Sequence, residues 1–271
     1  MQIGGQTVVV TGASRGIGKA TAEALGRAGA RVAVLARSAE IEAVAAAIAA
    51  NGGTARGYVA DAGNPDDVGR TARAIVSDLG DPAIVINNAG AGRWLHVEET
   101  PAEEVASMMA APYFAAFHAT RAFLPAMLAR QAGCIVNINS PVAYMPWPGA
   151  TGYLCARFAM RGFSEGLRLD LRGTGVRVLE VVPSEVTSSY FENNPHSRER
   201  LPRITRFVPK LSPEQVAQAI IRGIERDRTR VVTPAMLRAA LSMRALAPWL
   251  VDWLMWRTGA RRAVAAPGRQ P

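Results

Sequence analysis

Eight residues near the amino terminus, TGASRGIG at positions 11–18, constrain the fold more than any other stretch of the chain. They follow an apolar, β-branched run and lead into a helix-like segment at 19–29. A strand that turns through glycines into a helix can cradle a dinucleotide, because the free amides at the start of the helix face the pyrophosphate. Gly12 permits the tight turn, and Gly16 and Gly18 allow the pyrophosphate and the next strand to approach closely.

Short apolar runs alternate with longer amphipathic stretches along the first two thirds of the chain. The predicted strands are 7–11, 31–36, 55–59, 84–87, 134–139 and 177–182. The predicted helices are 16–28, 39–51, 65–79, 101–130 and 152–172. This alternation is typical of an α/β protein with a doubly wound parallel sheet that carries helices on both faces. Ligand is then expected at the carboxyl ends of the strands.

The chain of 271 residues shows no internal repeat, and the sequence favours a single domain. We expect residues 1–190 to form the dinucleotide-binding and catalytic core. Residues 191–271 would form a substrate lid, centred on 193–210, and a basic, Trp-rich carboxyl-terminal extension of the same domain. A helix is expected to start at the segment Ser-Pro-Glu-Gln, 212–215.

Positive charge is concentrated in the last part of the chain. Residues 1–195 hold 16 Lys and Arg against 17 Asp and Glu, whereas residues 196–271 hold 15 against 5. These charges are scattered and no nucleic-acid motif accompanies them, so a nucleic-acid partner is not expected. An anionic lipid surface, an acidic partner and a merely solvated basic surface remain the alternatives.

The sequence has two cysteines and no recognisable leader segment, which predicts a cytoplasmic protein. The alternative prediction is a cytoplasmic protein attached peripherally to the membrane.

Several motifs together resemble those of the short-chain dehydrogenase/reductase family. TGASRGIG is similar to its TGxxxGxG turn, and residues 87–90 read Asn-Asn-Ala-Gly, as its NNAG motif does. Ser140 precedes Tyr153 by thirteen residues, and Pro183 begins a segment like the one that contacts the nicotinamide. The likeness covers about residues 5–190. It implies a Rossmann-like sheet, a nicotinamide cofactor, reversible hydride transfer at a carbonyl or alcohol carbon, and a homodimer or homotetramer.

The end of the second predicted strand indicates which cofactor is bound. An NAD site needs a carboxylate there for the ribose 2′-hydroxyl, but the strand ends Ala36-Arg37-Ser38. Arg37 and Arg15 can instead hold a 2′-phosphate, which predicts NADP(H); the alternative is that both are surface arginines. The resemblance adds Asp61 at the adenine and Asn88 to Gly90 at the adenosine. The predicted cofactor-binding residues are Gly12, Ser14, Arg15, Gly16, Ile17, Gly18, Arg37, Asp61, Asn88, Ala89, Gly90, Tyr153, Arg157, Pro183, Val186 and Thr187.

The resemblance assigns the catalytic roles to Tyr153, as proton donor or acceptor, and to Ser140, which holds the substrate oxygen. The family has a lysine one helical turn after the tyrosine, and this chain has Arg157 there. A tyrosine hydroxyl ordinarily has a pKa near ~10, so it needs a nearby cation to work at neutral pH. Arginine on the same helix face supplies that cation, although its planar fork is bulkier than an ammonium. No metal-ligand spacing is present.

A second departure falls in the predicted helix 101–130, where the family places an asparagine that helps hold a water. Alignment puts Pro112 at that position. Proline removes a helical hydrogen bond, so we expect a kink that frees the carbonyl of Met108 to hold the relay water instead. With two catalytic positions changed, the alternative to an active oxidoreductase is a weak or inert NADP(H)-binding protein that serves as sensor or scaffold.

Aromatic residues are expected around the substrate and in the tail. Five aromatic residues or histidines lie in predicted loops near the substrate: Trp94, His96, Tyr144, Trp147 and Tyr190. They would either favour a hydrophobic substrate or only pack within the loops.

The apolar run 245–256 carries Trp249, Trp253 and Trp256 at helical spacing, and a basic segment that extends to residue 262 follows it. It is too short to span a bilayer. Packing against the body or a second subunit is favoured by Asp252 within the run, and a membrane-surface contact through 245–262 is the alternative.

Overall fold

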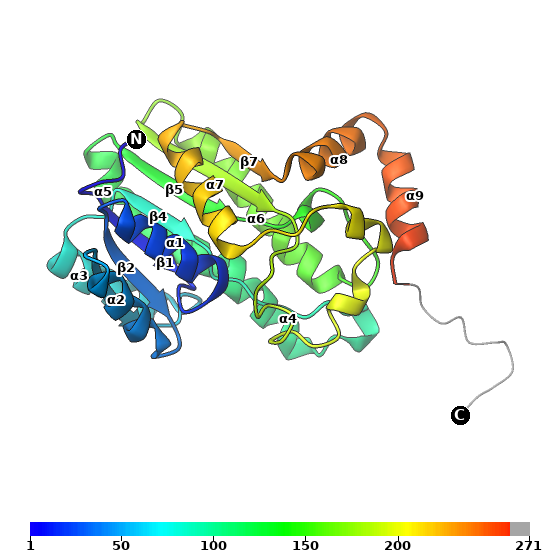
Figure 1. Cartoon of the computed structure of the whole chain (residues 1–271), viewed down its shortest axis with the longest axis horizontal. Coiled ribbons are helices and arrows are strands. Elements are labelled where there is room, and N and C mark those ends of the chain that lie inside the picture. The colour runs from blue at the N-terminus through cyan, green and yellow to red at the C-terminus, as the bar shows by residue number, and fades with distance from the viewer. Residues whose placement is uncertain (261–271) are drawn as a thin grey trace, which may run out of the picture.

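The computed structural model describes residues 1–260 as an α/β fold around one seven-stranded parallel sheet. The strand order is β3-β2-β1-β4-β5-β6-β7, with every neighbouring pair parallel (Figure 1). The strands are β1 (Thr7–Thr11), β2 (Arg31–Ala36), β3 (Thr54–Val59), β4 (Ile84–Asn87), β5 (Gly133–Ile138), β6 (Val176–Pro183) and β7 (Arg230–Thr233). The doubly wound fold predicted from the sequence is confirmed.

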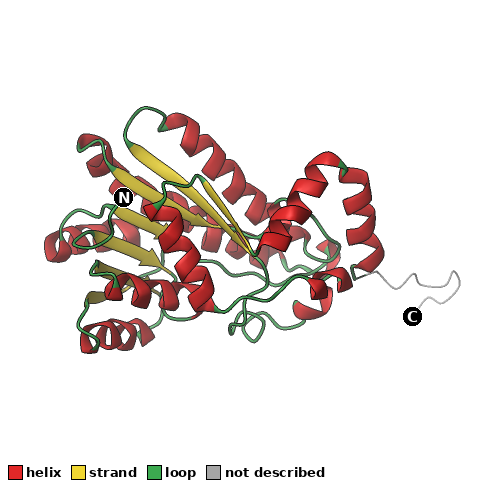
Figure 2. Ribbon diagram, turned by 45° about the horizontal axis from the view of Figure 1, so that its top comes forward, coloured by secondary structure: helices red, strands yellow, loops and turns green. Residues whose placement is uncertain are grey.

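Helices cover both faces of the sheet, as the ribbon view shows (Figure 2). They are α1 (Gly16–Arg27), α2 (Glu40–Ala50), α3 (Pro65–Leu79), α4 (Ala102–Met109), α5 (Ala115–Ala129), α6 (Thr151–Asp170), α7 (Pro213–Glu225), α8 (Ala235–Leu246) and α9 (Pro248–Thr258). Successive side chains of a strand point to opposite faces, and so a strand covered on both sides must be apolar throughout. In β1, Val8 and Val10 pack with α1, α2 and α7, whereas Val9 packs with α3, α5 and α6.

The predicted helix 101–130 is wrong as a single element. A π-helical turn, η2 (Ala110–Phe114), separates α4 from α5, and Pro112 lies inside it. Proline lacks the N–H that an α-helix needs at this point, and the wider turn accommodates the loss, with the Ala115 N–H donating to the carbonyl of Ala110. The irregularity expected at Pro112 is therefore present, while the relay water at Met108 stays a prediction.

The carboxyl-terminal third holds two elements that the sequence analysis missed, β7 and α8. The apolar run 245–256 is divided between two helices, because α8 ends at Leu246 and α9 begins at Pro248. The two helices form a hairpin beside the carboxyl ends of the strands, next to the segment 191–210 (Figure 1). That segment contains two short 3-10 turns, η4 (Arg198–Arg200) and η5 (Arg203–Phe207). Residues 261 and 262, the end of the segment 245–262 for which a membrane contact was considered, lie outside the described residues.

No helix within residues 1–260 combines the length and the apolar character that crossing a membrane requires.

Candidate active site

A cavity of about 780 Å³ lies at the carboxyl ends of the strands and gathers most of the residues singled out in the sequence. All three predicted catalytic residues line it, together with the predicted cofactor-binding residues except two. The exceptions are Gly18 and Thr187. Gly18 lies under the turn rather than in the cavity, and Thr187 directs its Oγ1 to the carbonyl of Leu211 at 2.9 Å. One cavity therefore joins the glycine turn to Ser140 and Tyr153.

The turn between β1 and α1 has the geometry that its glycines require. Gly12 and Gly16 have φ values of 64° and 55°, a region that side chains with a Cβ rarely adopt. A Cβ on Gly18 would overlap the carbonyl oxygen of Gly12, so the helix can approach the turn this closely only with glycine there. The first residues of α1 have no side-chain cap, and their N–H groups are left for an anionic ligand.

The end of β4 holds this turn in place. Nδ2 of Asn88 donates to the carbonyls of Thr11 and Gly12, each at 3.1 Å, and the backbone N–H of Asn88 donates to Oγ1 of Thr11. Beyond β3, Asp61 accepts a hydrogen bond from the N–H of Gly63 and lines the cavity. The strand ends thus form a continuous wall on the side where the sequence predicts the adenosine.

At the end of β2, the cavity wall is formed by Arg37 and Ser38, with no carboxylate. Arg15, in the glycine turn, also lines the cavity, and its Nη1 donates to Oδ1 of Asn193 at 3.0 Å. Two arginines, Arg15 and Arg37, are therefore among the residues that line the cavity.

Tyr153 and Arg157 lie one turn apart on α6 and are both buried. The Arg157 guanidinium stacks over the Tyr153 ring, with Cζ 5.0 Å from the ring centroid. Its Nη1 donates to the carbonyl of Ile138 at 3.1 Å, and its Nη2 lies 2.6 Å from the point that a Cβ on Gly90 would occupy. The bulk of arginine is thus accommodated because residue 90 has no side chain.

These residues fit a nicotinamide dinucleotide. Nε of Arg157 is buried without a hydrogen-bond partner in the structure, although Arg157 lines the cavity. A buried donor of this kind calls for an acceptor, and ribose hydroxyls can supply one. Nε of Arg157 can thus serve a ribose hydroxyl, and the uncapped N–H groups at the start of α1 can serve the pyrophosphate.

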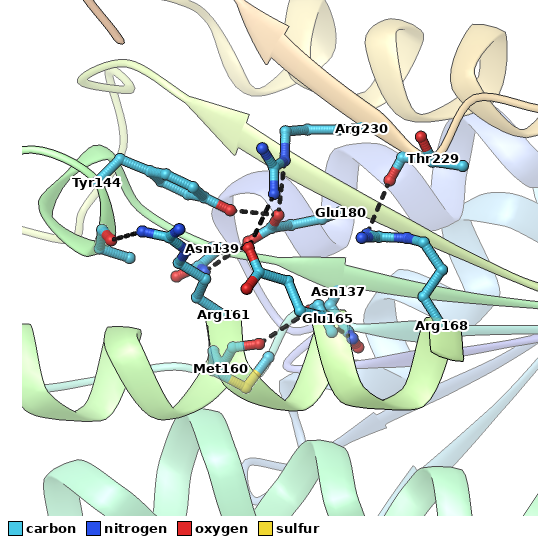
Figure 3. Close-up of polar contacts among 12 residues, drawn as sticks. Asn137, Asn139, Tyr144, Met160, Arg161, Glu165, Arg168, Glu180, Thr229 and Arg230 are labelled. Carbon is cyan, nitrogen blue, oxygen red and sulfur yellow. Dashed lines mark hydrogen bonds and ion pairs between the residues drawn. The ribbon is translucent and has the colours of Figure 1, made fainter. Parts of the chain in front are cut away.

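The sequence analysis missed a buried polar network around Asn139 and Glu180 (Figure 3). Asn139 connects this network to Ser140. Oδ1 of Asn139 accepts from the N–H of Ser140 at 2.9 Å, and Nδ2 of Asn139 donates to Oε1 of Glu180 at 2.8 Å. Glu180 is fully buried and its Oε2 also accepts from the Tyr144 hydroxyl and from Nε of Arg230, the latter at 3.1 Å. The sequence signal for this network was Glu180, the one acidic residue in the strand 176–183, which is apolar except for Glu180 and Arg177.

The same network fixes the segment that follows Ser140. The Tyr144 ring is stacked between Arg161 and Arg230, whose Cζ atoms lie 4.5 and 4.9 Å from its centroid. Burial, then the nearby charge of Glu180, raises the pKa of Tyr144 well above its usual range, so its hydroxyl remains a donor. Tyr144 does not line the cavity, contrary to the expectation that it would edge the substrate pocket, and neither does His96.

The far end of the cavity is aromatic and apolar. Trp94 packs against Trp147, Tyr153 and Tyr190, with ring centroids 5.3, 5.6 and 6.3 Å away. The Tyr190 hydroxyl donates to the carbonyl of Gly92 and accepts from Nε1 of Trp94, and burial raises its pKa well above the usual range. Leu201, Thr205 and Val208 of the segment 193–210, predicted as a substrate lid, also line the cavity. Sequence reasoning did not identify the further lining residues Met145, Phe191 and Leu237.

Comparison with known proteins gives consistent matches. A family model described as short chain dehydrogenase matches residues 6–199. The 3-oxoacyl-[acyl-carrier-protein] reductase of Synechocystis sp. is 33% identical over 220 residues, which are 79% of this chain and 87% of that protein.

Solved structures show the same fold over most of the chain. A short chain dehydrogenase/reductase from Burkholderia phymatum, in complex with NAD, aligns with a TM-score of 0.83 at 24% identity, over 97% of this chain and 100% of that one. An alcohol dehydrogenase from the archaeon Thermococcus sibiricus, complexed with 5-hydroxy-NADP, aligns with a TM-score of 0.74 at 25% identity, over 84% of this chain and 95% of that one.

Proposed function

Because this chain belongs to the short-chain dehydrogenase/reductase family, we propose that it is an NADP(H)-dependent oxidoreductase that interconverts a hydrophobic carbonyl compound and its alcohol. The observation that carries the proposal is one cavity that joins the glycine turn of β1 and α1 to Ser140, Tyr153 and Arg157. Its relatives are oxidoreductases, and structural neighbours hold NAD or an NADP derivative.

Each of the three residues has a distinct role in the proposed reaction. Tyr153 donates its hydroxyl proton to the carbonyl oxygen during reduction and accepts it back during oxidation. Ser140 donates a hydrogen bond to the same oxygen, and Arg157 places positive charge beside the tyrosine ring, 5.0 Å from its centroid. When bound, the nicotinamide supplies the hydride-transfer chemistry.

The preference for NADP(H) is supported by charge. Arg15 and Arg37 line the cavity, Arg37 at the end of β2, where the 2′-phosphate of the adenosine ribose is expected. Residues 37–39, directly after β2, include no carboxylate to accept from a 2′-hydroxyl. A guanidinium pair can bind a phosphate through several charge-assisted hydrogen bonds.

A hydrophobic substrate is supported by the lining of the cavity beyond Tyr153. Trp94, Trp147 and Leu237 form this end, and they offer few polar groups to a substrate. Apolar pockets with one or two polar groups orient a substrate through those groups and bind the rest of it by burial.

Assembly through α5 and α6 is the form of oligomer we propose. Phe114, Phe117, Phe158 and Leu169 are large, exposed apolar residues on or beside these two helices. Burying such a surface against its copy would remove apolar area from water, as dimer interfaces do. Sedimentation velocity at micromolar concentration would show a dimer or larger species if this holds and a monomer if it does not.

The proposed reaction is tested by NADPH oxidation, followed through nicotinamide absorbance, against hydrophobic aldehydes, ketones and quinones. Wild type should turn over at least one class, and Tyr153→Phe should lose activity about 100-fold or more while still binding NADPH. Turnover that persists in the Tyr153→Phe variant would contradict the assignment of Tyr153 as the proton donor. NADPH binding without any turnover would contradict the enzymatic proposal for this panel of substrates.

A further inference from the structure

The hairpin of α8 and α9 exposes a surface of large apolar side chains, which we call the hairpin surface: Met243, Leu246, Trp249 and Trp253. Trp249 is 73% exposed and Trp253 is 51% exposed. Tryptophan is large enough that exposing several on one short hairpin is costly in water. The body of the protein does not cover these side chains. The expected packing on the body is thus not found for them, and packing on a second subunit stays a prediction.

The hairpin is nevertheless firmly attached to the body. The opposite side of α9 is buried through Val251 and Met255, which pack in the same apolar cluster as Tyr153. Nε of Arg244 donates to Oδ1 of Asp252 at 2.8 Å, and Nη1 of Arg244 donates to the carbonyl of Tyr144 at 2.7 Å. The hairpin surface is thus presented by a fixed element, and its side chains are exposed.

Arginines outnumber acidic residues on the hairpin and on the turn that packs against it. Asp252 is the one acidic residue among residues 235–260, and Arg244 already pairs with it. Arg238 is exposed on α8. The neighbouring turn η5, which packs against α9, adds exposed Arg203 and Arg206. Apolar and aromatic side chains flanked by arginines are the composition of elements that lie in a membrane interface.

We propose that the hairpin surface binds the interface of a lipid bilayer that contains anionic lipids. Tryptophan rings would lie at the level of the headgroups, and the surrounding arginines would neutralise lipid phosphates and carboxylates. A second copy of the chain is a poorer partner, because a twofold contact would bring the arginines of both copies together. The proposal stands on exposure and charge and does not require the proposed reaction.

Docking in this way would place the substrate end of the cavity near the lipid. Leu237 of α8 lines the cavity, and η5, which also contributes to the lining through Thr205, packs against α9. A hydrophobic substrate dissolved in the bilayer would then reach the cavity without crossing much water.

Vesicle flotation of the full chain tests the proposal. Wild type should float with vesicles of phosphatidylcholine and phosphatidylserine, less with phosphatidylcholine alone, and less again at high salt. The double variant Trp249→Ser/Trp253→Ser should lose about tenfold or more in binding, since two large apolar side chains no longer leave water. Val76→Ser, which changes an apolar residue 39% exposed on α3, outside both the hairpin surface and the proposed subunit interface, is the control and should float as wild type does.

Both tryptophans are exposed, so the double variant should keep its NADPH affinity, and that measurement shows that it folds. Equal flotation of wild type and the double variant would overturn the proposal. So would wild type that fails to float. If wild type does not bind vesicles and the double variant sediments as a smaller oligomer than wild type, the proposal is overturned. The hairpin surface would then be an interface between copies of the chain.

Discussion

Nδ2 of Asn139 donates to Oε1 of Glu180 across 2.8 Å, and this bond ties the residue beside Ser140 to a carboxylate that solvent does not reach. The strands β5 and β6 place the two side chains next to each other, and Arg230 on β7 completes the set. A buried carboxylate is costly unless it is paired and fully hydrogen-bonded, and this one has three donors. The relationship makes Glu180 a positioning residue for Ser140 in the proposed reaction.

Glu180→Gln should therefore lower kcat by about tenfold while the NADPH Kd stays as in wild type, because the network does not touch the glycine turn. The glutamine amide would turn an N–H group toward Tyr144 or Arg230, which are themselves donors, so one hydrogen bond is lost. The free energy of unfolding should therefore fall by about 1 kcal/mol. The expected loss is small because Arg230 is 38% exposed and water can replace its lost partner. Steady-state kinetics and urea unfolding measure both effects.

Glu165→Gln is the matched control, since Glu165 pairs with Arg230 and Arg161 but not with Asn139. It should leave kcat near the wild-type value. If both variants lower kcat equally, Glu180 acts only through general stability and its positioning role is contradicted.

Arg157 offers a direct test of the cation beside Tyr153. Arg157→Met keeps much of the length and removes the charge, so kcat should fall about 100-fold and the KM for NADPH should rise. Arg157→Lys restores a cation and should recover most of the activity, because Gly90 leaves room for either side chain. An Arg157→Met enzyme as active as wild type would show that the guanidinium is structural.

Cofactor choice should depend on the two arginines that border the cavity. Arg15→Ala/Arg37→Ala should weaken NADPH binding by about tenfold to 100-fold and leave NADH binding nearly unchanged, since only the former carries the extra phosphate. The ratio of kcat/KM for the two cofactors measures this. Arg31→Ala, an exposed arginine at the start of β2, is the control. An unchanged ratio would contradict the proposed preference.

The sequence predicted those features that are determined locally. The sheet followed from short apolar runs separated by amphipathic helices, and the glycine turn followed from residues that need left-handed φ or close approach. The signal at Pro248 was also local, because proline favours the first turn of a helix, but the apolar run concealed it.

Features that depend on long-range packing could not be predicted in this way. Glu180 meets Asn139 and Arg230 only because three separate strands lie side by side in the sheet. Leu237 lines the cavity only because α8 folds back over the strand ends. Short-range sequence patterns predict where a helix or strand begins, but they do not indicate which distant side chains it contacts.

The ion pair between Arg93 and Glu104 gives a prediction for acid stability. Hydrogen bonds from Arg93 hold the Glu104 pKa below its usual range, and the pair fastens the loop before Trp94 to α4. Because the folded pKa is the lower one, the pair stabilises the native state above the unfolded pKa, near ~4.3. That stabilisation is lost as the pH falls through the folded value. Urea unfolding across acidic pH should therefore show a shallower loss of stability for Glu104→Gln than for wild type, with the two curves converging at the lowest pH; parallel curves would contradict it.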